Sequence, residues 1–293
     1  MNSRICHNSE LDRLRSYSSV FSRSVFTRMM KYDDFSVINL VCKTYDSDYI
    51  AKQATYGDYL DKMYLSLALK YRTEYVYKNS LLNKIVSTYR SRKITVFNEF
   101  KVGDSIADVA TFNGKSCVYE IKTALDSPKR LASQTEDYLK FFQECYLVVP
   151  KEMVEDYAES TDERFGILTV NENRSVISIS KYRAAATQMD NMDVDVLMRV
   201  LWIQEYESII KRYFGQLPDV GYYEMYNTCK EMMRKIPVEK LSKMTVDIIK
   251  KRKACDLLFE NDKKNLTQMC LALNFNKRQY SHLCDNLNKT IIL

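Results

Sequence analysis

Hydrophobic positions change their spacing twice along the chain. In residues 11–89 and again in residues 194–287, apolar side chains recur every three or four positions, which is the period of an amphipathic helix. Between residues 94 and 181, short runs rich in Val, Ile, Phe and Tyr alternate with turn residues, as is typical of β-strands. The pattern therefore predicts a sheet-forming segment between two helical regions.

The individual runs give the expected elements. Strands are predicted in ITVFNEFKV, SIADVATFN, SCVYEIKTA, CYLVVP, FGILTV and VISIS. Helices are predicted over residues 59–71, 74–89, 127–142, 194–213, 222–236, 238–259 and 266–287. The central order is strand, strand, strand, helix, strand, which indicates an α/β fold with a mixed sheet.

The changes of pattern also set the expected domain boundaries. We expect an N-terminal helical segment in residues 1–56, an α/β core in residues 57–182 and a C-terminal helical domain in residues 183–293. The C-terminal helices are a candidate surface for a protein partner, and the chain is a candidate homodimer. Trp202, in the C-terminal region, is expected to pack inside it.

Composition limits the chemistry. No apolar run is long enough to span a membrane and no apolar signal core is present, so we expect a cytoplasmic protein with no membrane partner. The two histidines and the eight cysteines, none closely paired in sequence, disfavour a zinc site and histidine-based catalysis. A net charge of +6 is compatible with a nucleic-acid partner without identifying one. Any catalysis therefore has to use carboxylates and lysine.

The second and third predicted strands carry the candidate chemistry, in Asp108, Glu120 and Lys122. Residues two apart in a strand share a face, so Glu120 and Lys122 project to the same side of an apolar strand. Carboxylates on neighbouring strands suit Mg²⁺ or Mn²⁺, and a nearby lysine orients water and stabilises developing phosphate charge. The alternative is that these residues are surface charges forming an ordinary salt bridge.

Strand register gives this hypothesis a test. A plain two-residue turn at Asn113-Gly114 would place Asp108 opposite Tyr119, on the other face from Glu120. We therefore predict a bulge or a three-residue turn between Phe112 and Ser116 that brings Asp108 level with Glu120.

The helix predicted after these strands adds Gln134 and Tyr138, which lie one turn apart on one face. Both are candidates to position a phosphate or a water molecule. Asp126 and Arg130 flank the start of this helix, where an acidic side chain favours the helix dipole, and we interpret Asp126 as a cap.

Asp108, Glu120-Ile121-Lys122 and Gln134-x-x-x-Tyr138 resemble the motif of the PD-(D/E)XK nuclease superfamily, including its RecB-like branch. More narrowly, the sequence is similar to a poorly characterised bacterial family of PD-(D/E)XK-like proteins. The resemblance covers roughly residues 57–181 and is specific in residues 96–150. Ala107 stands where the superfamily has its proline.

The resemblance implies a restriction-endonuclease-like core and a Mg²⁺- or Mn²⁺-dependent deoxyribonuclease, expected to be an endonuclease. It implies Asp108 and Glu120 as metal ligands, Lys122 as the catalytic lysine, and Gln134 with Tyr138 as accessory catalytic residues. A third acidic ligand is expected at Glu74 or, as the alternative, Glu99. A role in phage defence follows from the bacterial character of the family.

Basic residues outside this motif are weaker candidates for nucleic-acid binding. They are Arg130, Lys250, Lys251 and Arg252. A charge run on a helix is more often its solvated face. Two alternatives to the nuclease remain: a nucleic-acid-binding protein that keeps the fold without catalysis, and an interaction protein such as a phage-defence or regulatory component.

Overall fold

A computed structural model describes residues 2–89, 94–124, 126, 131–173, 176–188, 192–252 and 255–292. The chain forms two compact units, each assembled from segments that are distant in sequence. The first unit comprises residues 1–90, 171–179 and 255–293, and the second comprises residues 91–170 and 180–254. These boundaries differ from the expected ones at 56/57 and 182/183, because helical periodicity does not reveal which segments pack together.

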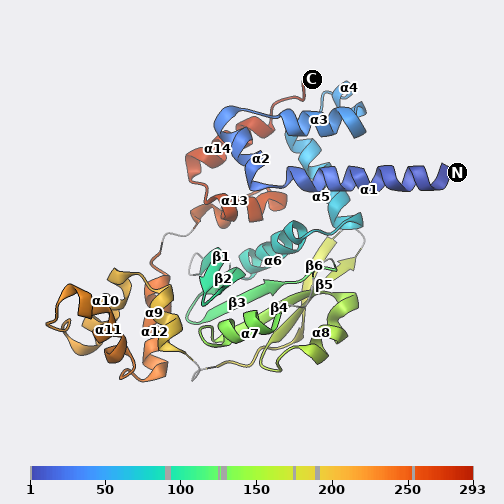
Figure 1. Cartoon of the computed structure of the whole chain (residues 1–293). Helices are drawn as coiled ribbons and strands as arrows, with labels where there is room; N and C mark the ends of the chain where they lie inside the picture. The colour runs from blue at the N-terminus through green and yellow to red at the C-terminus, as the bar shows by residue number, and fades with distance from the viewer. Residues whose placement is uncertain are drawn as a thin grey trace. The chain divides into compact units, whose positions relative to one another are not determined.

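The second unit contains a six-stranded mixed sheet in the order β1-β2-β3-β4-β5-β6 (Figure 1). The strands are β1 (Thr95–Val102), β2 (Ser105–Phe112), β3 (Ser116–Ile121), β4 (Glu144–Pro150), β5 (Gly166–Asn173) and β6 (Val176–Arg183). Strands β1, β2 and β3 form an antiparallel meander, whereas β4 runs parallel to both β3 and β5. The predicted α/β class, mixed sheet and six strands are therefore confirmed.

Six α-helices of the second unit lie in the described residues. They are α7 (Leu131–Leu139), α8 (Val154–Ser160), α9 (Val194–Val200), α10 (Ile203–Phe214), α11 (Tyr222–Met233) and α12 (Val238–Ile249), with a 3₁₀ turn η2 (Lys151–Met153) before α8. The helix predicted over 194–213 is interrupted, because Leu201 is extended and the backbone N–H of Trp202 is capped by Glu205 at 2.8 Å. Residues 127–130, where the first of these helices was predicted to begin, lie outside the described residues.

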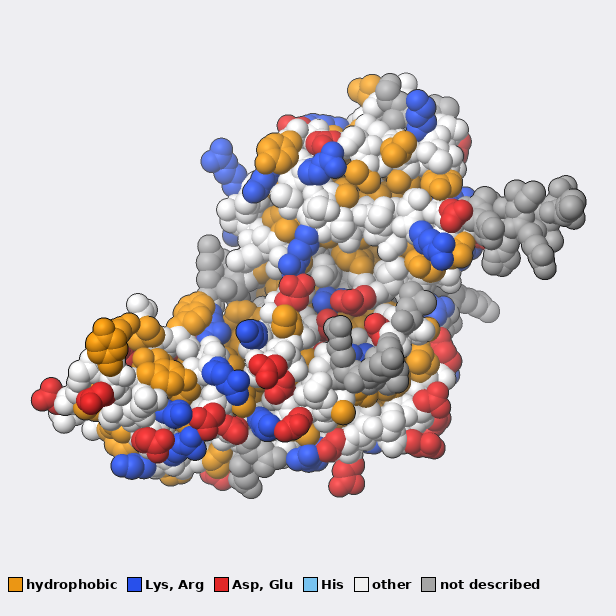
Figure 2. Space-filling view, in the orientation of Figure 1, with side chains coloured by type: hydrophobic (Ala, Val, Ile, Leu, Met, Phe, Trp, Pro, Cys, Tyr) orange, Lys and Arg blue, Asp and Glu red, His pale blue; other side chains and the backbone are white. Residues whose placement is uncertain are grey.

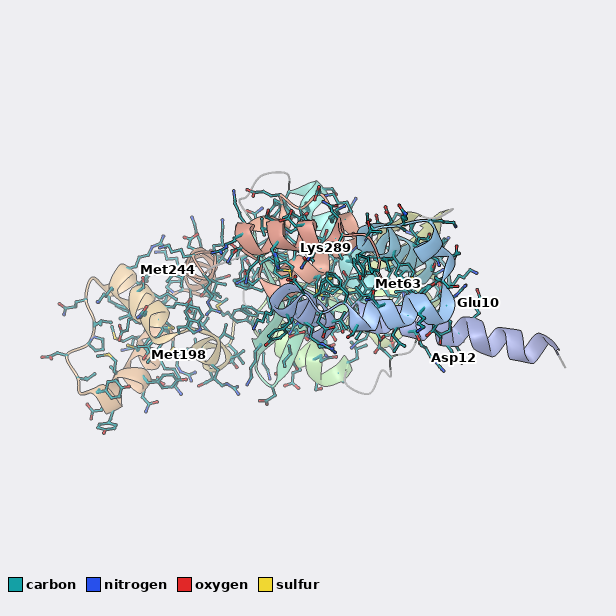
Figure 3. The ribbon with its side chains drawn as sticks, turned by 90° about the horizontal axis from the view of Figure 1, so that it is seen from above. Glu10, Asp12, Met63, Met198, Met244 and Lys289 are labelled. Atoms are coloured by element: carbon teal, nitrogen blue, oxygen red, sulfur yellow. The ribbon has the colours of Figure 1, made fainter. Side chains whose placement is uncertain are left out.

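The core of the second unit joins the sheet to its helices. Phe100, Phe112 and Phe142 form an aromatic cluster with ring centroids 5.4–6.2 Å apart. The same core continues through Met198 of α9 and Met244 of α12, which are labelled in Figure 3. Helices α9 to α12 therefore share a core with the sheet and do not form the separate C-terminal domain that was expected.

The first unit is helical and combines both ends of the described chain, as the blue and red helices of Figure 1 show. Its elements are α1 (Asn2–Val20), α2 (Arg23–Tyr32), α3 (Ser36–Tyr45), α4 (Asp48–Ala51), α5 (Tyr56–Lys70), α6 (Glu74–Thr88), η3 (Asp256–Leu258), η4 (Lys264–Leu266), α13 (Thr267–Leu273) and α14 (Lys277–Leu287). Buried Asn79 links the two segments, because its amide donates to the carbonyl of Lys264 (2.7 Å) and accepts from the N–H of Gln268 (2.9 Å).

Two features that composition raised can be followed in the structure. The seven cysteines from Cys42 to Cys284 are free thiols, and six of them are buried. None of the helices in the described part of the chain has both the length and the apolar character that crossing a bilayer requires.

Candidate active site

The predicted site residues come from three elements of the second unit. Asp108 lies on β2, Glu120 on β3 and Lys122 directly after β3, while Gln134 and Tyr138 lie on α7. Helix α7 is fixed over the sheet by Asp137, whose carboxylate accepts from the Ser105 hydroxyl at 2.6 Å in the β1–β2 hairpin.

The β1–β2 turn depends on this contact. Gly103 has a φ of +59°, and a Cβ there would lie 2.5 Å from a carboxylate oxygen of Asp137. Glycine is therefore required both by the turn and by the close approach of α7.

The register of β2 and β3 confirms the predicted three-residue turn. Phe112 pairs with Ser116 and Val109 pairs with Tyr119, so Asn113, Gly114 and Lys115 form the turn. The same register, continued by one position, places Asp108 opposite Glu120. The carboxylate of Asp108 accepts from the N–H of Ile121 at 2.8 Å, directly beside Glu120.

Glu120 is the centre of a hydrogen-bonded network. Its Oε1 accepts from Lys122 Nζ at 2.8 Å and from Gln134 Nε2 at 2.7 Å, and its Oε2 accepts from the Tyr138 hydroxyl at 2.8 Å. Lys122 Nζ also donates to Gln134 Oε1 at 2.9 Å. The structure therefore brings together four of the five predicted residues in one network, with Asp108 next to it.

The electrostatics of this network follow from burial and from Asp108. Glu120 is 4% exposed and Lys122 is 7% exposed. Burial raises the pKa of Glu120, and the negative charge of Asp108 raises it further, against the opposing effects of Lys122 and Tyr138. Burial and the Glu120 carboxylate also raise the pKa of Tyr138, so this hydroxyl stays a hydrogen-bond donor.

The donor set suits a hard divalent cation. Mg²⁺ keeps several waters and is commonly held by one or two carboxylates together with substrate phosphates. Asp108 and Gln134 are partly exposed, so solvent reaches this side of the network, whereas Tyr138 closes the other side. Within the described residues, no group of three or more His, Cys, Asp or Glu side chains could hold a metal ion. An ion bound here would therefore have at most two carboxylates of the motif as ligands, those of Asp108 and Glu120, and water and substrate would have to supply the rest.

Comparison with known proteins gives a family. Residues 68–274 match the family model described as Bacteriophage P4 protein cII, which is more than half of the 293 residues. The chain belongs to this family. No curated protein sequence matches the chain. Among solved structures, a protein of unknown function from Silicibacter pomeroyi matches with a TM-score of 0.31 and 17% identity, covering 50% of this chain and 97% of that one.

The two candidates for a third acidic ligand lie elsewhere. Glu74 belongs to α6 in the first unit, where it pairs with Lys78 at 3.2 Å. Glu99 is exposed on β1 and lines a cavity together with Lys101, Arg199 and Trp202. Both assignments stay predictions.

The basic residues predicted to bind nucleic acid differ in their surroundings. Arg252 is occupied, because its guanidinium donates to Glu205 at 2.7 and 2.6 Å and to the carbonyl of Val200 at 2.8 Å. Lys251 is exposed and Lys250 is half-buried. Arg130 lies outside the described residues. Of the four candidates, Lys251 is the one whose exposure best suits contact with a phosphate.

Sequence reasoning missed Tyr157, which lies near Lys122. Burial raises the pKa of Tyr157 on α8, and the ammonium of Lys122 opposes this shift, so the two groups interact. Asp126 accepts from the backbone N–H (2.7 Å) and the hydroxyl (2.8 Å) of Thr123, so it fixes the chain directly after Lys122. Its predicted role as a helix cap concerns residues 127–130, which lie outside the described residues, and stays a prediction. The spacing of Val154 and Tyr157 is the sequence signal that indicates the short helix.

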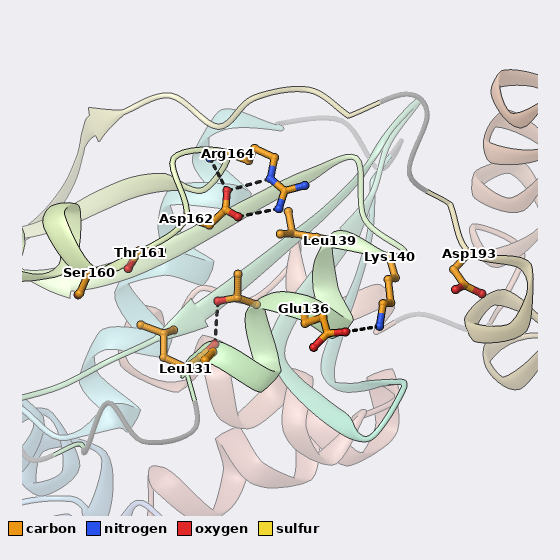
Figure 4. A pocket seen from close by; sticks show the side chains of 11 residues that line it. Leu131, Glu136, Leu139, Lys140, Ser160, Thr161, Asp162, Arg164 and Asp193 are labelled. Carbon is orange, nitrogen blue, oxygen red and sulfur yellow. Dashed lines mark hydrogen bonds and ion pairs between the residues drawn. The ribbon is translucent and has the colours of Figure 1, made fainter.

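A cavity of 690 Å³ lies on the other side of α7, between this helix and the segment that follows α8 (Figure 4). None of the five network residues lines it. Four of its charged groups pair with each other, Arg164 with Asp162 at 2.6 Å and Lys140 with Glu136 at 2.6 Å, and the fifth, Asp193, caps α9. The chemistry of the second unit therefore concentrates on the Glu120 side of the helix.

Proposed function

We propose that the chain is a metal-dependent nuclease with a restriction-endonuclease-like core, which hydrolyses phosphodiester bonds in DNA as an endonuclease. One observation supports this proposal above all. Residues singled out by a nuclease-like motif, on two strands and a helix, converge on Glu120 with Asp108 beside it. A surface salt bridge does not need the glutamine and the buried tyrosine that complete this network.

The proposed mechanism assigns a role to each residue. Asp108 and Glu120 would hold Mg²⁺ or Mn²⁺, which supplies Lewis-acid activation of the phosphate and lowers the pKa of a bound water. Lys122 places an ammonium beside the Glu120 carboxylate, where it would neutralise charge that develops on the phosphate. Gln134 and Tyr138 orient Glu120, because each donates to a different oxygen of its carboxylate.

The test is cleavage of supercoiled, linear and single-stranded DNA, and of RNA, in Mg²⁺ or Mn²⁺. Wild type is compared with Asp108→Asn and Lys122→Met, after circular dichroism has shown that both variants are folded. We expect cleavage by wild type and its loss in both variants. Cleavage that persists undiminished in either variant would falsify the assignment.

A second function is favoured by the occupied state of Glu120, which already accepts three hydrogen bonds. A carboxylate offers about four acceptor positions, so little capacity remains for a metal ion. In this alternative the chain binds nucleic acid with the same fold and does not cut it. Binding by wild type without cleavage of any substrate in either metal would support this alternative.

A further inference from the structure

A second cavity in the same unit lies along the edge strand β1. It has a volume of 560 Å³ and is lined by the strand, by the β1–β2 turn and by residues at the junction of α9 and α10. It includes Trp202, which is 62% exposed, in contrast to the expectation that this residue packs inside the helical region.

Trp202 is held rigidly despite its exposure. The guanidinium of Arg252 lies 4.5 Å from the centroid of the indole ring, and Arg252 is itself fixed by two hydrogen bonds to Glu205. A cation over an indole face is a favourable contact, and it keeps the ring in one orientation. The chain therefore maintains a large, flat, solvent-facing aromatic surface at the mouth of a cavity.

The wall of the cavity carries unsatisfied polar groups. Both the amide nitrogen and the amide oxygen of Asn98 are buried and lack a hydrogen-bond partner among the described residues. An unpaired buried amide costs free energy. The neighbouring Glu99 has a φ of +55°, which is uncommon for a residue other than glycine and is typical of functional sites.

The cavity carries charges of both signs. Lys101 and Arg199 line it and are exposed, beside the exposed carboxylates of Glu99 and Asp104, while Arg252 is paired with Glu205. An aromatic platform beside exposed cations is the arrangement that binds the stacked bases and phosphates of single-stranded nucleic acid.

The cavity also adjoins the candidate active site along β1. Asn98 pairs with Val109 and Phe100 pairs with Ala107, so Glu99 stands opposite Asp108 in the same register. The cavity and the candidate active site therefore use neighbouring strands of one sheet.

We propose that this cavity binds single-stranded nucleic acid, with one base stacked on Trp202 and its phosphates beside Lys101 and Arg199. The proposal rests on the proposed function for its biological meaning, because it supplies a path for the strand that is cut. Binding itself requires neither the metal nor Lys122, so it is tested without catalysis.

The chain offers a direct probe, because Trp202 is its single tryptophan. Full-length protein is titrated in EDTA with oligo-dT of about 12 nucleotides, a length within the usual site size, and intrinsic fluorescence is recorded. Stacking of a base on Trp202 is expected to quench this fluorescence in step with binding measured by anisotropy. A duplex of equal length and polyphosphate are the reference ligands, and both should leave the fluorescence nearly unchanged.

Variants then locate the contact. Trp202→Ala is expected to weaken oligo-dT binding roughly 5- to 150-fold, and Trp202→Phe much less, because a phenyl ring still stacks. Tyr223→Ala is the matched control, since Tyr223 is 93% exposed on α11 and does not line the cavity. Figure 2 shows hydrophobic side chains gathered on the surface around α11. This variant should bind like wild type.

The outcomes separate the two proposals. Quenching in EDTA without cleavage in Mg²⁺ supports the binding site and contradicts the nuclease, whereas cleavage without quenching contradicts the binding site alone. Equal quenching by polyphosphate, or equal affinity of Trp202→Ala and wild type, also overturns the binding site. An equal loss of affinity in Tyr223→Ala overturns it as well, because stacking would then be unspecific.

Discussion

Each unit of the molecule contains a carboxylate that is 4% exposed and is bound to a lysine and to tyrosine. In the first unit, Asp46 forms an ion pair with Lys62 and accepts from the hydroxyls of Tyr17 (2.6 Å) and Tyr59 (2.7 Å). In the second unit, Glu120 accepts from Lys122, Gln134 and Tyr138. The two networks are built from nearly the same types of side chain, namely a carboxylate, a lysine and one or two tyrosines.

Their difference lies in a second carboxylate. Asp108 stands beside Glu120 and raises its pKa, whereas the first unit places two tyrosines and a lysine around Asp46. A single buried carboxylate with a lysine is compatible with a purely structural role. Two like charges held together cost stability, and such a cost is typical of a site that needs them for chemistry. Burial and pairing alone therefore do not indicate a catalytic site.

The largest expected effect is a contrast in cleavage between the two lysines. Lys122→Met should lower cleavage about 10²- to 10³-fold, the usual loss when an electrostatic group is removed from an active site. Lys62→Met should leave cleavage per folded molecule unchanged. Initial rates on supercoiled DNA, normalised to the folded fraction from circular dichroism, measure both. A comparable loss in Lys62→Met would remove the distinction between the networks.

The next effect concerns stability. Lys62→Met should lower the free energy of unfolding by about 3 kcal/mol, because it leaves the buried carboxylate of Asp46 without its cation. The double variant Asp46→Asn with Lys62→Met should recover part of this loss, since no buried charge remains. Urea denaturation followed by circular dichroism gives these values. A double variant less stable than Lys62→Met would contradict the account.

A smaller effect is expected in the pH dependence of stability. The pKa of Glu120 is raised in the folded state by burial and by Asp108. As the pH rises, Glu120 therefore loses its proton at a lower pH in the unfolded chain than in the folded protein. The contribution of Glu120 is therefore complete below its ordinary pKa, and the free energy of unfolding falls as the pH rises through the raised pKa.

Asp108→Asn should make this fall smaller, because it removes the like charge, and Glu120→Gln should remove it altogether. Unfolding free energies of the three proteins between acidic and neutral pH test this. An unchanged fall in Glu120→Gln would show that another group is responsible.

The smallest effect is expected at Lys251. Because Lys251 is exposed on the surface, Lys251→Ala should weaken DNA binding only slightly and lower the slope of log affinity against log salt by about 0.9. Anisotropy titrations at several salt concentrations measure this slope. A slope equal to that of wild type would exclude Lys251 from phosphate contact.

The sequence predicted the individual strands and turns better than it predicted which elements pack together. All six strands were located, because β-branched and aromatic residues in short runs bounded by turn residues report strands directly. The parity of residues 108–120 predicted a bulge or a three-residue turn, and the observed register has the turn, which sets Asp108 opposite Glu120. Which helices pack together was not predictable, because contacts such as that of Asn79 with Lys264 depend on residues far apart in the chain.

The candidate site was predictable to a similar extent. The motif identified the residues around Glu120, but it gave no account of Tyr157, whose proximity to Lys122 arises from the packing of α8. The exposure of Trp202 was also missed. A lone aromatic residue in a helical pattern normally indicates core, and the capping by Glu205 that places Trp202 at a helix start is a tertiary detail.

The assembly of the first unit from residues at both ends of the described chain has a consequence for biosynthesis. Most of the second unit is translated after α6 and before α13, so it has a complete sequence while the earlier helices still lack their partners. Until residues 255–293 are translated, α1 to α6 therefore lack the helices that pack against them. The surface that α13 and α14 later cover is exposed during this time. A chain truncated before residue 255 would therefore contain the whole sheet but lack the two helices that complete the first unit.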